Sequence, residues 1–172
     1  ANACQSFRFS GDRVSYYLSC SIGEVLKTRI VTWRGNSNKF VLFSGGITSA
    51  ITSAISTTVI SGLYGARYLA LESFLDYVGS GTTVTAIVQT RINTNLWTDI
   101  CNFTFTGASG RKIQSLDSAF ISGQRTPTSG TMAGNTAING ILGDELRAIY
   151  SSTGDHGSGA GVTLVLAGVV RQ

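Results

Sequence analysis

The chain has 172 residues, a formal net charge of +4 and 42% hydrophobic residues, so it is long enough to bury a core and too apolar for a disordered chain. Charged residues make up only 13% of the sequence, about half of the roughly 25% usual in globular proteins, and Ser, Thr and Gly fill the difference. Surfaces this poor in charge are typical of exported proteins and of subunits whose surface is buried by assembly. We therefore expect a single domain, 1–172, with a mild basic excess that permits a polyanion partner without demanding one.

The three cysteines, Cys4, Cys20 and Cys101, have neither the spacing of metal ligands nor a CxxC pattern. In a secreted chain they could form at most one internal disulfide, and in a reducing compartment all three would remain thiols, which is the reading we favour. The first residues show no basic stretch followed by an apolar one, so no targeting signal is recognised. Ala1 could follow removal of an initiator Met or of a signal peptide.

Residues 5–44 contain short runs of aromatic and β-branched residues, such as "RVSYYLSC" and "KFVLFS", separated by turn residues. This pattern predicts an antiparallel meander of strands.

The next segment carries no charged residue from Phe40 to Ala66, and it contains the tandem repeat "ITSAITSA". Ile47, Ile51, Ile55 and Val59 recur every four residues, which predicts helical packing on one face. Gly62 and Gly65 divide the segment into two expected helices, 47–61 and 64–78. Ser and Thr in every turn make it a poor membrane span, so we expect a core helix or a surface that packs against copies of itself.

Two strands are predicted at "TTVTAIVQTRI" and "LWTDICNFTFTG", joined by the turn "NTN". Alternation puts Val84, Ala86, Val88 and Ile92 on the inner face of the first strand, and Trp97, Cys101, Phe103 and Phe105 on the inner face of the second. The opposite faces would form a flat, polar to basic platform.

The remaining segments are a loop-rich region at 107–134, a helix at 135–151 and a final strand, "VTLVLAGVV". The fold class we expect is α+β, with an antiparallel sheet of about six to eight strands and two or three helices packed on one face.

No catalytic or metal signature stands out, so we expect no enzyme, no cofactor and no metal. His156 is the only histidine and lies beside Asp155 and Ser158, an arrangement too tight for a catalytic triad, so we expect it in an exposed turn. The run "GSGAG" precedes a strand, whereas a phosphate-binding loop follows one.

The C-terminal half resembles the coat proteins of single-stranded RNA bacteriophages, through "TAIVQTRI", "LWTDICNFTFTGAS", the helix expected at 135–151 and the ending "VVRQ". In those proteins a shared antiparallel sheet faces the RNA. The resemblance implies a self-assembling coat subunit that packages RNA, located in the virion. The implied RNA-binding residues are Thr83, Thr85, Gln89, Arg91, Asn102 and Thr104.

A second set of fragments is similar to ribosome-inactivating N-glycosidases: "SFRFSG", "RGNSNKF", "GARY" and Trp97. Arg67 would match the active-site arginine of that family and Trp97 its pocket tryptophan, but Tyr64 stands where the catalytic glutamate belongs and Arg29 where a stacking tyrosine belongs. This resemblance implies a secreted toxin. A secreted binding domain is the third hypothesis, for which the sequence offers no ligand.

Overall fold

The structure, a computed structural model, describes residues 37–63, 66–76, 81–93, 95–120, 123–124, 126–156 and 162–171. Across these ranges it is all-β, with nine strands and no helix. The strands are β1 (Ser37–Ile47), β2 (Ile51–Ser56), β3 (Ile60–Ser61), β4 (Tyr68–Asp76), β5 (Thr83–Asn93), β6 (Leu96–Thr106), β7 (Gly110–Asp117), β8 (Glu145–Thr153) and β9 (Val162–Arg171). The strands expected before Ser37, together with Cys4 and Cys20, lie outside the described residues.

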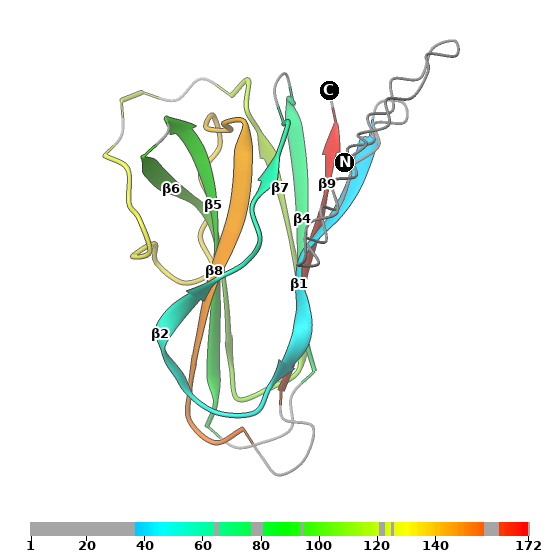
Figure 1. The fold of residues 1–172 in the computed structure, drawn as a ribbon, viewed down its shortest axis with the longest axis vertical. Coiled ribbons are helices and arrows are strands. Elements are labelled where there is room, and N and C mark those ends of the chain that lie inside the picture. The colour runs from blue at the N-terminus through cyan, green and yellow to red at the C-terminus, as the bar shows by residue number, and fades with distance from the viewer. Residues whose placement is uncertain are drawn as a thin grey trace, which may run out of the picture.

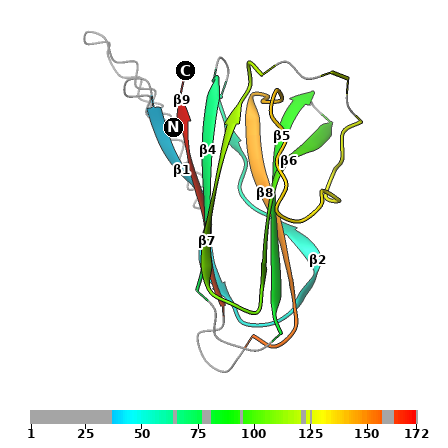
Figure 2. The ribbon, with the colours of Figure 1, turned by 180° about the vertical axis from the view of Figure 1, so that it is seen from behind.

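The strands form two antiparallel sheets that pack face to face (Figures 1 and 2). Sheet I has the order β1-β9-β4-β7, and sheet II has the order β2-β8-β5-β6, with the short β3 pairing β8 beyond β2. Of the nine strands, only β5 and β6 are both consecutive in sequence and paired with each other, as a β-hairpin. The other long-strand connections cross from one sheet to the other, so each sheet is assembled from strands distant in sequence.

This strand order is that of a jelly roll, a sandwich of two four-stranded antiparallel sheets built from nested Greek keys. Counting β2 and β3 as one position beside β8 gives the eight positions of that architecture. The connections β3–β4, β5–β6 and β7–β8 gather at one end of the sandwich, which we call the loop end (Figure 1).

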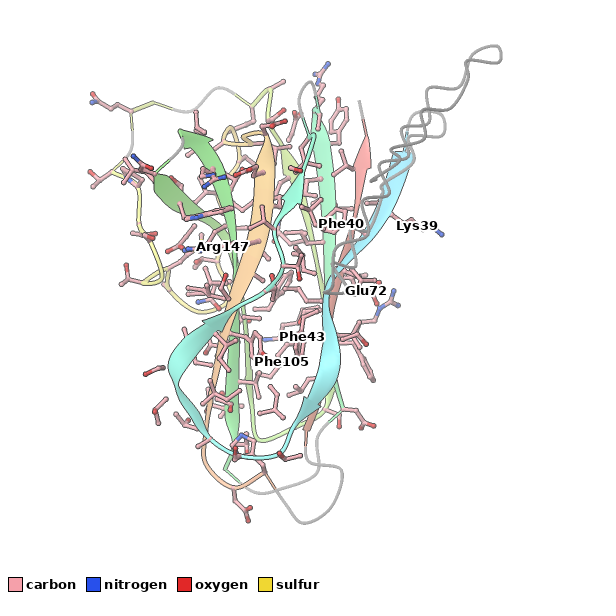
Figure 3. The ribbon with its side chains drawn as sticks, viewed as in Figure 1. Lys39, Phe40, Phe43, Glu72, Phe105 and Arg147 are labelled. Carbon is pink, nitrogen blue, oxygen red and sulfur yellow. The ribbon has the colours of Figure 1, made fainter. Side chains whose placement is uncertain are left out.

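The core lies between the sheets and is filled by side chains that alternate along each strand. In β4 the inward positions are Leu69, Leu71, Ser73 and Leu75, all at most 1% exposed, while Tyr68 and Phe74 point outward. Phe43 of β1 meets Tyr150 of β8 with ring centroids 4.4 Å apart, and this contact ties the two sheets together. Figure 3 shows Phe43 and Phe105 in the space between the sheets.

The helices expected at 47–61 and 64–78 are not formed over the described residues, so the α+β prediction is wrong. β2 and β3 occupy the first segment and β4 most of the second. A spacing of four residues is a multiple of the two-residue period of a strand as well as close to one helical turn, so it could not separate the two structures. The β-branched Ile, Thr and Val of this segment favour the strand.

The helix expected at 135–151 is also wrong: Glu145–Thr153 is β8, and the residues before it are irregular, with Asn135 at a φ of 57°. The region expected to be loop-rich, 107–134, contains the strand β7. The strands predicted around 83–106 and at the C-terminus are confirmed as β5, β6 and β9. Across the described ranges, no helix has the length and apolar character that crossing a membrane requires.

Candidate nucleic-acid interface

The six residues implied as RNA-binding share one surface, the outer face of sheet II. The strand register places cross-strand rows on this face, each with one residue from β8, β5 and β6. From the end opposite the loop end the rows are Thr153–Thr83–Thr106, Ser151–Thr85–Thr104, Ile149–Ile87–Asn102, Arg147–Gln89–Asp99 and Glu145–Arg91–Trp97. The sequence therefore predicted this face correctly for β5 as far as Arg91 and for the second half of β6.

Trp97 was expected on the inner face and lies on the outer one. The pairing of β5 with β6 shifts between Val88 and Gln89, since Val88 faces Cys101 whereas Gln89 faces Asp99. Ile100 is the extra residue of this β-bulge, which reverses the alternation of β6 before it. Ile92, also expected inside, is 71% exposed next to the β5–β6 turn.

Part of the outer face is covered by residues 128–138, which we call the strap. It runs along the free edge of β6, where Thr128 and Thr136 accept hydrogen bonds through their carbonyl oxygens from the backbone N–H groups of Asp99 and Asn102. The backbone N–H of Ile138 in turn donates to the carbonyl oxygen of Ile100. An edge strand covered in this way cannot pair with another chain.

Two of the implied RNA-binding residues are buried, Asn102 against the strap and Gln89 against Asp99. Asn102, 3% exposed, donates from Nδ2 to the carbonyl oxygen of Met132 at 2.6 Å. Gln89, 1% exposed, donates from Nε2 to Oδ1 of Asp99 at 2.7 Å. With the strap in this position neither side chain reaches a ligand, so both serve the structure here.

Asp99 is the anchor of the strap. Its two carboxylate oxygens accept hydrogen bonds from the backbone N–H groups of Gly130, Thr131 and Met132 at 2.8, 3.1 and 3.2 Å. Burial favours the neutral carboxyl, but the donors around it outweigh burial, so the pKa of Asp99 lies below its usual value. The ionised carboxylate is the form that holds the strap.

The accessible part of the outer face is split by the strap. Thr83, Thr85 and Thr104 are half-buried towards one end. There the Thr104 hydroxyl donates to Oδ1 of Asn102 at 2.9 Å, and the ammonium group of Lys112 donates to the Thr104 carbonyl oxygen. Arg91 lies at the loop end and is the only cation among the six implied residues. The continuous platform expected from the sequence is therefore interrupted.

Arg91 belongs to a compact cluster with Trp97, Arg147 and Glu145. The guanidinium carbons of Arg91 and Arg147 lie 4.9 and 4.2 Å from the centroid of the Trp97 ring, within the range of cation–π contacts. Arg91 forms an ion pair with Glu145, and Arg147 donates from Nε to Oε1 of Gln89 at 2.9 Å. Figure 3 shows Arg147 on the side of sheet II away from sheet I.

The two arginines of this cluster repel each other. Burial, and then the charge of Arg91, lower the pKa of Arg147 below its ordinary value, and Asp99 opposes this shift in part. Sequence reasoning missed Arg147, because 135–151 was expected to be a helix, and missed the role of Trp97, because the bulge had no recognisable signal. Once 145–153 is read as a strand, alternation alone puts Arg147 on the face of Gln89.

The residues that resemble an N-glycosidase site are not brought together by any contact among the described residues. Arg67, beside β4 of sheet I, pairs with Asp117 at 3.7 Å and stacks on Tyr68, whereas Trp97 lies in sheet II within 5 Å of the guanidinium carbons of Arg91 and Arg147. Tyr64 and Arg29 fall outside the described ranges.

His156 was expected in an exposed turn and is instead buried, at 4% exposure, with Nε2 2.9 Å from the hydroxyl of Ser152. Cys101 is a buried free thiol, and burial raises its pKa to about 12. In the parts of the chain that the structure describes, no group of three or more His, Cys, Asp or Glu side chains is placed to hold a metal ion. Comparison with protein-family models and with curated proteins finds no match to this chain.

Proposed function

We propose that this chain is the subunit of a self-assembling shell, a viral coat protein that packages RNA. The observation that carries the proposal is the jelly-roll strand order of the two sheets. Viral capsid proteins use this architecture repeatedly, although lectin domains and cupins use it too. A fold by itself does not define a function, but two features of the molecular surface also support the proposal.

The loop end carries large apolar side chains that a solitary soluble domain would be expected to cover. Ile92 and Leu96, on either side of the β5–β6 turn, are 71% and 70% exposed, and Phe120, just after β7, is 54% exposed. Both segments lie at the loop end in Figures 1 and 2. Apolar side chains gathered on one end of a molecule are typical of contact surfaces between proteins.

The outer face of sheet I is a second surface suited to contact with other copies. Val41, Tyr68, Phe74 and Ile113 are 39–60% exposed on β1, β4 and β7, and the ion pair of Glu72 with Arg111 lies among them. The low overall charge, 13% of residues, fits a chain whose surface is shared with neighbours. RNA would be held by Arg91 and the accessible Thr hydroxyls, mainly through phosphate.

The test is whether the purified full chain forms closed particles that protect RNA. Particles visible by electron microscopy, whose co-purifying RNA resists nuclease until they are dissociated, are the expected result. A chain that stays monomeric at high concentration, with or without added RNA, would rule the proposal out. Release of adenine from ribosomes by that monomer, lost in Arg67→Gln, would favour the secreted toxin instead.

A further inference from the structure

Two like-charged groups share one aromatic ring at the loop end of sheet II. Arg91 and Arg147 come from neighbouring strands, β5 and β8, yet both guanidinium groups lie within 5 Å of the centroid of Trp97. Bringing two cations together costs free energy unless a negative charge offsets it. Sites that bind anions commonly contain such paired arginines, because the ligand supplies the missing charge.

Two carboxylates of the described residues, Glu145 and Asp99, act on this cluster, and both are already engaged. Glu145 is paired with Arg91. Asp99 is directed into the strap, where three backbone N–H groups and the Gln89 amide satisfy its oxygens. Although these acids balance the formal charge of the cluster, neither of them accepts a hydrogen bond from Arg147 in the described residues.

Arg147 is held in place with its end groups available. Its Nε donates to Gln89, whose own position is fixed by Asp99, so the chain of hydrogen bonds from the strap orients the guanidinium. Among the described residues, Nε is the only atom of this side chain that donates a hydrogen bond, which leaves the two terminal NH₂ groups without a protein acceptor. A guanidinium oriented in this way presents two parallel N–H donors, which match two oxygens of a phosphate.

We propose that Arg91, Arg147 and Trp97 bind a phosphate group, which is a phosphodiester of the packaged RNA. The identification of RNA as the source of the phosphate rests on the proposed function; the site itself does not require a shell. Arg147 supplies the two-pronged contact, Arg91 adds charge, and Trp97 supports both guanidinium groups and excludes water from one side of them. The salt dependence of RNA binding then includes a contribution from this cluster.

The chain offers a matched control in Arg67. Its guanidinium carbon also lies over an aromatic ring, 5.1 Å from the centroid of Tyr68, but there the carboxylate of Asp117 faces the guanidinium at 3.7 Å. Replacing Arg67 or Arg147 by Gln changes the net charge equally. A purely nonspecific electrostatic effect would therefore weaken binding to the same extent in both variants.

The experiment uses the full chain with Trp33→Phe, which leaves Trp97 as the only tryptophan. Its fluorescence is followed while a short single-stranded uridine oligomer or, separately, inorganic phosphate is added, at several salt concentrations. We expect Arg147→Gln to weaken oligomer binding by about tenfold or more and to lower the slope of log affinity against log salt by about 0.7. Arg147→Lys should recover only part of the affinity, because Lys lacks the planar fork. Arg67→Gln should bind like the parent chain.

Each outcome bears on the proposal. Arg147→Lys keeps the charge and most of the aliphatic side chain, so it should fold even if Arg147→Gln folds poorly. If the Lys variant binds the oligomer more weakly while its urea unfolding midpoint is unchanged, the loss of affinity supports the proposed site. If inorganic phosphate binds in an Arg147-dependent way and the oligomer binds no more tightly than phosphate, the phosphate site is supported but RNA is rejected as the ligand that supplies the phosphate. Equal affinities in the parent chain and in the Arg147 variants would overturn the proposal. Arg147-dependent binding by a chain that forms no shells would count against the proposed function alone.

Discussion

Gln89 Nε2 of β5 donates a 2.7 Å hydrogen bond to Oδ1 of Asp99, its cross-strand neighbour on β6, next to the β-bulge in the middle of this strand pair. The pair lies between two features of the outer face of sheet II: the strap, which Asp99 anchors, and Arg147, which Gln89 orients. The covering of the sheet edge and the position of the cluster therefore depend on the same buried polar contact.

The first prediction concerns the anchor. Asp99→Asn keeps the shape of the side chain but replaces one acceptor oxygen by an NH₂ group, which would then face a backbone N–H donor of the strap. Since both oxygens of Asp99 accept backbone N–H groups of the strap, either orientation of the Asn leaves an unsatisfied donor. We expect a loss of about 1.5–3 kcal/mol in the free energy of unfolding, measured in urea. Hydrogen exchange at residues 130–132 should rise more than exchange in β4, and equal rises would contradict the local role.

The second prediction is the pH dependence of that contribution. The folded pKa of Asp99 lies below its unfolded value, so its stabilising effect is complete above the unfolded pKa of about 3.9 and is lost as pH falls through the folded pKa. The stability difference between the parent chain and Asp99→Asn should therefore be constant near neutral pH and shrink in acid below about pH 4. Other carboxylates with lowered pKa values, such as Glu72, are present in both proteins and cancel in the difference. A difference that did not change down to strongly acid pH would contradict this account.

The third prediction tests the packing of sheet I. Gly168 of β9 is the cross-strand neighbour of Phe40, whose ring packs over it. A Cβ atom at Gly168 would lie 2.5 Å from Cζ of Phe40 and 2.8 Å from the carbonyl oxygen of Ala70. Gly168→Ala should destabilise the fold by about 1–3 kcal/mol, because the clash involves the backbone of β4 as well as a ring. Gly123→Ala, where a Cβ would meet nothing within 4 Å, is the control and should leave the unfolding midpoint unchanged.

The fourth prediction concerns the exposed apolar side chains at the loop end. The double variant Ile92→Asp and Leu96→Asp replaces two side chains that are about 70% exposed, so the isolated subunit should lose no more than about 0.5 kcal/mol of stability. If these side chains form subunit contacts, the variant should fail to form particles under conditions in which the parent chain forms them. Ile55→Asp on β2 places a charge at a 45% exposed site away from the loop end and serves as the control. Particle formation by the double variant as readily as by the parent chain would exclude this surface.

The parts of the fold that the sequence predicted are those whose periodicity was unambiguous. Val84, Ala86 and Val88 recur at every second position, interrupted only by the apolar Ile87, and they occupy the core as expected. The spacing of Ile47, Ile51, Ile55 and Val59 fitted a helix and a strand equally, so among the local signals only the β-branched composition favoured a strand. The strand is stabilised by tertiary contacts, because β2 pairs with β8, which lies about ninety residues later in the sequence.

In the candidate site, too, some residues could be predicted from local alternation and others could not. Arg91 and the Thr positions followed from alternation along β5 and β6, whereas the hydrogen bond that buries Asn102 is made to the strap, which comes from a segment with no periodic pattern. Trp97 was placed on the wrong face because one extra residue, Ile100, reverses the alternation. Arg147 became visible only through the strand register that joins β8 to β5.

The most direct test of the central claim is the size of the purified chain, measured by size-exclusion chromatography with light scattering and electron microscopy of the leading fraction. The account predicts closed particles of many subunits, of uniform diameter, in equilibrium with smaller species. A homogeneous monomer of 18.1 kDa at high protein concentration, over a range of salt and in the presence of RNA, would contradict it.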